Sequence, residues 1–345
     1  MKKIIGILLA GALVTSAFAA DVSAKVQLEG ELLNITDGAV NALSINKPSD
    51  QHWNPIMNFA VNGDQAGAEF AVFTGSIESA GGWNKGFGVH ANRFKIWMSP
   101  FAGFKFIFGL NGFNLNQETI TWSKTDSGVE AYGYGINYSN SGFSLDLAFL
   151  PNGSGSHEWG ASWFAKPKDG DVSIGGTALK AEYAADFGKI NGILYAASTF
   201  KDLKFGLGYS NNFSGINMFA NVLGYVNDGF NKLRVELFAN GNVDAFSWAV
   251  FVAPNMGLAG DFSMDLQLVA KAAYNFGSVN AYLLIGENAS NIGLVNNKAF
   301  ELSIQPGVDG NIGGAGWNVG LRLNLAKPDG MTVKFAIPVS ISMGW

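Results

Sequence analysis

The densest group of regularly spaced charges in this sequence lies between residues 232 and 239. Lys232, Arg234 and Glu236 occupy every second position there, and leucine, valine and alanine alternate with them. Because successive side chains of a β-strand point to opposite faces, the three charges would share one face of a strand. Such a row can attract or repel charged solutes. The first candidate chemistry is therefore electrostatic contact with ions or charged solutes.

Residue combinations for catalysis are sparse. The chain has three histidines, His52, His90 and His157, and all of them fall in polar gaps between apolar runs. His157 and Glu158 form the only adjacent acid–base pair, and a solvated loop explains them as well. The glycine-rich stretch 307–316 lacks the residue order of a phosphate-binding loop. Since no spacing suits a metal site either, we expect no enzyme, no metal and no cofactor.

The elements that carry these residues are expected to be β-strands. The last fifteen residues alternate without interruption, with apolar side chains on one face and small or polar ones on the other. The apolar face holds Met331, Val333, Phe335, Ile337, Val339, Ile341, Met343 and Trp345. The segments 178–187, 262–276 and 317–325 alternate in the same way, and helical periodicity is absent after the N-terminal segment.

Clusters of Gly, Asn, Asp and Ser separate the alternating runs and predict turns. These turn signals lie at 62–64, 139–142, 187–189, 240–242, 277–278 and 327–330. Alternating runs joined by tight turns indicate an antiparallel meander. No shift in composition divides the chain, so residues 20–345 are expected to form one domain.

The N-terminus has the features of a secretory signal. Lys2 and Lys3 precede the short apolar run 4–14, and residues 17–19 supply small side chains at the spacing of a cleavage site. We predict cleavage after Ala19, which leaves 20 basic and 27 acidic residues. That net charge of −7 offers no basic surface for nucleic acid. The chain contains no cysteine and therefore neither a lipoprotein anchor nor a disulfide.

The repeated apolar faces must be shielded from water. A soluble sandwich would bury them between two sheets, whereas a barrel in lipid would turn them outward and keep the polar faces around a lumen. The polar faces are rich in Gly, Ala, Ser and Asn, and aromatic residues gather near strand ends, as they do at membrane interfaces. An open sheet edge would leave backbone groups unpaired in hydrocarbon. We therefore predict an all-β fold, a closed antiparallel transmembrane β-barrel.

The number of strands follows from the length. Bacterial single-chain barrels have even numbers of strands, and about 20 residues per strand and turn predict about 16 strands, with 14 or 18 as alternatives. Pro338 interrupts the last strand because it lacks an N–H group for the ladder. We expect a β-bulge or a local break at that position.

With its signal segment, its meander and its terminal aromatic residue, the chain resembles bacterial outer-membrane β-barrel proteins of the porin type. Its Gly- and Phe-rich texture is similar to that of spirochaete outer-membrane proteins. The resemblance implies location in outer-membrane lipid, a water-filled channel for passive diffusion of small polar solutes or ions, and often a homotrimer. It also implies insertion by the barrel-assembly machinery, with an assembly signal formed by Phe335, Ile337, Val339, Ile341, Met343 and Trp345.

Charged side chains are costly against lipid, so we expect them to line the lumen. The pore-lining candidates are Lys105, Lys180, Glu182, Lys232, Arg234, Glu236, Arg322 and Lys334. Acids at equivalent positions, among them Glu31, Asp146 and Asp265, nearly balance the cations, so strong ion selectivity is not expected. The row from Lys232 to Glu236 is predicted to border the constriction. The alternative is that these charges pair across strands and fill the interior.

The polar gap 111–128 corresponds in order to the third outside loop, which folds into the pore of many porins. In that case Glu118 and Asp126 would face the basic wall, and deletion of residues 114–124 should widen the channel. An ordinary surface loop is the alternative. A second class of function is a surface barrel that acts as an adhesin or structural protein through outside loops such as 34–54 and 78–90. The polar inward faces argue against a transporter of hydrophobic substrates.

Overall fold

A computed structural model describes residues 21–36, 38–44, 56–76, 87–118, 120, 128–151, 174–197, 202–227, 229–287, 292–296, 299–327 and 332–344. The predicted signal peptide lies outside these residues. The strands are β1 (Asp21–Thr36), β2 (Ala39–Ser44), β3 (Ile56–Asn62), β4 (Ala66–Ser76), β5 (Phe87–Phe101), β6 (Phe104–Asn114), β7 (Gly128–Asn140), β8 (Phe143–Pro151), β9 (Ile174–Ala185), β10 (Gly188–Ala197), β11 (Asp202–Phe213), β12 (Ile216–Asn227), β13 (Phe230–Val243), β14 (Phe246–Gly257), β15 (Ser263–Asn275), β16 (Val279–Gly286), β17 (Ile292–Val295), β18 (Glu301–Ile312), β19 (Ala315–Gly320), β20 (Arg322–Ala326) and β21 (Thr332–Gly344). Within the described ranges, no helix is long and apolar enough to span a membrane.

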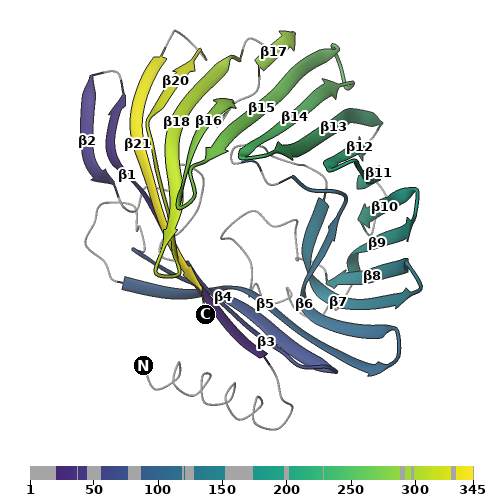
Figure 1. Cartoon of the computed structure of the whole chain (residues 1–345). Coiled ribbons are helices and arrows are strands. Elements are labelled where there is room, and N and C mark those ends of the chain that lie inside the picture. The colour runs from purple at the N-terminus through teal and green to yellow at the C-terminus, as the bar shows by residue number, and fades with distance from the viewer. Residues whose placement is uncertain are drawn as a thin grey trace.

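Antiparallel pairing runs around the wall and returns to its start. Strands in neighbouring positions of the wall pair with each other, and β21 pairs with β1 from Lys25↔Gly344 to Thr36↔Lys334. Figure 1 shows the resulting ring of strands. The predicted closed antiparallel β-barrel is therefore confirmed.

The described strands fill eighteen positions in the wall, because three positions hold two segments each. β2 and β3 pair with successive parts of β1, β16 and β17 with successive parts of β15, and β19 and β20 with successive parts of β21. The prediction of 16 strands is wrong, and its alternative of 18 is correct. The turns at one end hold only two or three residues, so each strand with its turn uses less chain than the length estimate assumed.

The connections at the two ends of the barrel differ in length. Turns at one end, called here the short-turn end, hold two or three residues, and connections at the opposite end, called the long-loop end, are longer except after β1 and after β12. At the predicted turn 139–142, Ser141 and Gly142 have φ values of 48° and 83°, as type I′ hairpin turns require. The turn predicted at 240–242 is wrong, because β13 continues through it and turns at 244–245.

The outer face of the wall is apolar. Leu207 and Leu237 are 68% and 46% exposed, whereas Gly208 and Glu236, one position away on the same strands, are buried. This alternation is typical of a barrel that turns its apolar side chains toward lipid. The two faces therefore follow the sequence pattern.

Apolar side chains also occupy part of the inner face, where the sequence pattern predicted polar ones. Ile120 is buried in one cluster with Phe238 and Phe251, and Phe113 and Leu115 are buried in a second cluster. A fully buried side chain of this kind contributes roughly 1.5–3 kcal/mol. These clusters form the surface against which the chain after β6 packs.

Pro338 lies beside irregular pairing on both of its neighbours. Toward β1 the register moves from Glu31↔Pro338 to Asn34↔Ala336, so β1 contains one extra residue. On the other side, the pairing partner of β21 changes from β19 to β20 at Leu321. The predicted bulge is therefore confirmed, and it arises because proline has no N–H group for the ladder.

Candidate functional site

The chain after β6 returns into the barrel interior and binds the wall through an amide. Asn116 is 6% exposed and donates from Nδ2 to Oδ1 of Asn221 over 3.1 Å. Its own Oδ1 accepts from Nδ2 of Asn191 over 3.1 Å, and its backbone carbonyl accepts from Nδ2 of Asn221 over 2.8 Å. We call Asn116, Asn191 and Asn221 the amide triangle. It joins this segment to β10 and β12.

A glycine makes room for the amide triangle. A Cβ atom on Gly208 would lie 2.3 Å from Oδ1 of Asn191, 2.7 Å from Oδ1 of Asn221 and 2.8 Å from Nδ2 of Asn116. Contacts this short exceed what packed atoms tolerate, and the amides could not keep their positions. The hydrogen bonds therefore depend on glycine at position 208.

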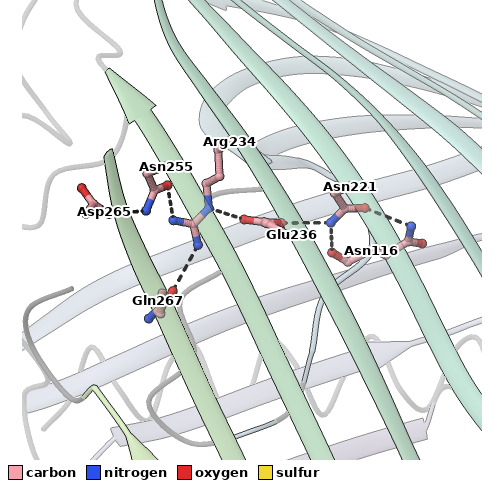
Figure 2. Close-up of polar contacts among 7 residues, drawn as sticks. All are labelled: Asn116, Asn221, Arg234, Glu236, Asn255, Asp265 and Gln267. Atoms are coloured by element: carbon pink, nitrogen blue, oxygen red, sulfur yellow. Dashed lines mark hydrogen bonds and ion pairs between the residues drawn. The ribbon is translucent and has the colours of Figure 1, made fainter. Parts of the chain in front are cut away.

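A chain of polar contacts continues from the triangle across β13, β14 and β15 (Figure 2). Asn221 donates to Oε2 of Glu236 over 3.0 Å, and Nε of Arg234 donates to Oε1 of Glu236 over 2.7 Å. Arg234 also donates to Asn255 over 2.6 Å and to Gln267 over 3.1 Å. We call the following residues the Arg234 network: Arg234, Glu236, Asn255, Asp265 and Gln267, with Asn255 donating to Asp265 over 2.7 Å.

Burial determines what this network can do. The Glu236 side chain is fully buried, and the Arg234 side chain is 12% exposed. Two charges buried in this way must compensate each other, because a buried charge without a partner is strongly unfavourable. The guanidinium donates from all three of its nitrogens within the network. Arg234 therefore links β13 to β14 and β15, and its charge is little available to a solute.

The predicted constriction residues are only partly described. Glu118 is half-buried, and its Oε2 makes no hydrogen bond to the described part of the chain. Asp126 lies outside the described residues. The prediction that both face a basic wall stays a prediction.

The remaining pore-lining candidates lie outside the Arg234 network. Glu182 forms ion pairs with Lys180 at 3.3 Å and with Lys189 at 3.5 Å. Arg322 forms an ion pair with Glu31. Ion pairs within β9 and between strands therefore offset the charge of these candidates, and their role as pore-lining residues stays a prediction.

Three lysines complete the candidate set. The ammonium of Lys105 lies 4.4 Å from the ring centroid of Trp97, a cation–π distance. Lys232 and Lys334 are exposed. In the charged row on β13, Arg234 and Glu236 pair with each other, whereas Lys232 is exposed to solvent.

Sequence reasoning missed the amides that connect the site. Asn116, Asn191, Asn221, Asn255 and Gln267 are all buried or half-buried partners of the charges or of one another. A partial signal was present, since Gln267 lies on the polar face of the alternating segment 262–276. Only the register between strands shows which amides meet.

The outward face of β21 agrees with the predicted assembly signal. Phe335, Ile337, Val339, Ile341 and Met343 alternate with the inward positions, and Ile341 is 56% exposed. Trp345 lies outside the described residues. Recognition of this strand by assembly machinery stays a prediction.

Comparison with known proteins places the fold. No protein-family model and no curated protein matches the chain. Among solved structures, Pseudomonas aeruginosa OccK9 (OpdG) is similar with a TM-score of 0.56 at 12% identity, over 94% of this chain and 98% of that chain. OccK8 (OprE) of the same organism gives a TM-score of 0.55 at 10% identity over 94% and 98%. The outer membrane protein OpdK gives 0.52 at 11% over 94% and 99%. The chain therefore has the fold of outer-membrane β-barrel proteins of the porin type.

Proposed function

We propose that this protein is a channel in the bacterial outer membrane for passive diffusion of small polar solutes or ions. The amide triangle is the observation that carries the proposal. It fixes a chain segment inside the barrel, bound to β10 and β12, so the segment narrows the interior. A barrel that only anchored outside loops would need no such segment inside.

The charges of the inner face suit a channel of weak ion selectivity. Ion pairs such as Lys180–Glu182 and Arg234–Glu236 offset most of the fixed charge. Lys232 and Lys334 remain exposed, as does Asp244, so these side chains would give only a weak preference between anions and cations. The inner lining therefore supports passage of neutral polar solutes as well as ions.

The proposal includes how the chain reaches its place. Residues 1–19 would direct export and be removed after Ala19. The apolar outward face would contact outer-membrane lipid, and the assembly machinery would recognise β21. The short-turn end would face the periplasm, as in known barrels. Assembly into a homotrimer is part of the same proposal.

The test is the conductance of the refolded mature protein in a planar lipid bilayer. Discrete and stable current steps are expected, with heat-unfolded protein as the control. Silence from protein that is folded and inserted would contradict the proposal and move the search for function to the outside loops. Deletion of residues 114–124 should increase the step size, and an unchanged step would refute a constriction at this segment.

A further inference from the structure

A polar cavity lies on the inner face at the short-turn end, away from the amide triangle. It has a volume of about 570 Å³ and extends from the β13–β14 hairpin to β18. Lys271 lies four residues along β15 from Gln267 of the Arg234 network, which is about 13 Å at the rise of a strand. The cavity is therefore a separate place along the same interior.

One wall of this cavity is held in place by its own contacts. Asp309 accepts from Nδ2 of Asn280 over 2.7 Å, and its other carboxylate oxygen lies 3.9 Å from Nζ of Lys271. The same ammonium lies 5.0 Å from the ring centroid of Tyr282, whose hydroxyl accepts from Gln305. The charge of Lys271 is thereby offset, so a charged solute gains little attraction from this wall.

The opposite wall of the cavity presents polar side chains that have no hydrogen-bond partner in the described part of the chain. Asn242, Asp244 and Ser247 line the cavity, and their side chains make no hydrogen bond or ion pair within the described ranges. An amide both donates and accepts, a carboxylate accepts, and a hydroxyl does both. Donors and acceptors of hydrogen bonds thus meet in one cavity.

We infer that this cavity binds a neutral, hydroxyl-rich solute of the size of a small saccharide. A sugar hydroxyl can donate one hydrogen bond while it accepts another. It can therefore bind to an amide, a carboxylate or an ammonium group. The volume lies within the range of about 300–1,000 Å³ typical of small-molecule sites. The inference rests on the proposed function only in requiring a water-filled interior.

Calorimetric titration of the refolded mature protein with maltose and maltotriose tests the inference. The detergent must have no sugar headgroup, because such a headgroup would compete. Saturable binding is expected, and Asn280→Ala should weaken it roughly three- to tenfold by removing the amide that positions Asp309. Ser247→Val, on the opposite wall, should weaken binding independently and serves if the first variant fails to fold.

The matched control is Asn137→Ala. Asn137 donates to Asp146 over 2.6 Å across two neighbouring strands, as Asn280 does to Asp309, but outside this cavity. Unchanged binding is expected there, and equal weakening in both variants would overturn the location. Tighter binding of lysine or glutamate than of sugar would overturn the ligand class. If the protein conducts ions but shows no saturable heat of sugar binding, the sugar site is refuted and the channel is not. If it binds sugar but does not conduct, the proposed channel is refuted and the sugar site is not.

Discussion

Two regions of the wall each hold an arginine–glutamate pair, and the pairs serve different connections. Arg234 and Glu236 lie on one strand, and amides from β12, β14 and β15 surround them. Arg322 and Glu31 lie on β20 and β1 with β21 between them, where the small Ala336 leaves space for the contact. The first pair binds the wall to the segment inside it, and the second links strands where Pro338 weakens the ladder.

The difference shows that similar ion pairs can have unequal importance. Each glutamate accepts from an amide besides its arginine, but Glu236 is fully buried, while Arg322 and Glu31 each keep 13% exposure. Partial contact with water reduces the cost of losing a partner. Removal of a charge should therefore affect the first region most.

The largest effect is expected for Glu236→Ala. Loss of the carboxylate removes the buried charged partner of the Arg234 guanidinium and an acceptor of Asn221, which should lower the free energy of unfolding by about 3–5 kcal/mol. Urea unfolding in detergent micelles measures it. Glu182→Ala is the control, since its ion pairs are partly exposed and should contribute less than about 1 kcal/mol. Equal losses of unfolding free energy in the two variants would contradict the distinction between a buried and a partly exposed ion pair.

A smaller loss is expected for Arg322→Ala at the closing strands. Glu31 keeps a second donor, Nδ2 of Asn34 at 2.5 Å, so we expect about 1.5–3 kcal/mol from the lost charged hydrogen bond. The same urea titration measures it. A loss greater than that of Glu236→Ala would reverse the comparison between the two regions.

Asn116→Ala separates the interior segment from the wall without removing a charge. It leaves the side chains of Asn191 and Asn221 without the amide they contact, which should cost about 1–3 kcal/mol. Release of the segment should also increase single-channel conductance. Asn140→Ala, an exposed amide at the short-turn end, should change neither value. A conductance equal to that of the unmodified protein would show that the triangle does not hold the constriction.

The smallest effect is expected for Lys232→Gln. An exposed charge contributes at most about 1 kcal/mol, so the anion-to-cation permeability ratio should fall by no more than about fivefold. Reversal potentials across a salt gradient measure this ratio. Stability should not change. A larger shift in Arg234→Gln than in Lys232→Gln would restore Arg234 as the residue that meets the solute.

Alternation predicted the strands and their faces because it depends only on neighbouring residues. The bulge at Pro338 was predictable for the same reason, since a missing N–H group is a local property. The turn at 240–242 was mispredicted because Gly241 is required for packing and not for a turn. A Cβ atom at this position would lie 3.2 Å from the Trp248 ring. The amide triangle was not predictable, because it depends on which strands, far apart in sequence, lie side by side.

The amide triangle has a consequence for the order in which the barrel forms. Asn116 contacts residues 75 and 105 positions further along the chain. Its binding place does not exist until β10 and β12 have entered the wall. The interior segment therefore takes its position only after β10 and β12 have joined the wall, and until then it cannot narrow the interior through these contacts.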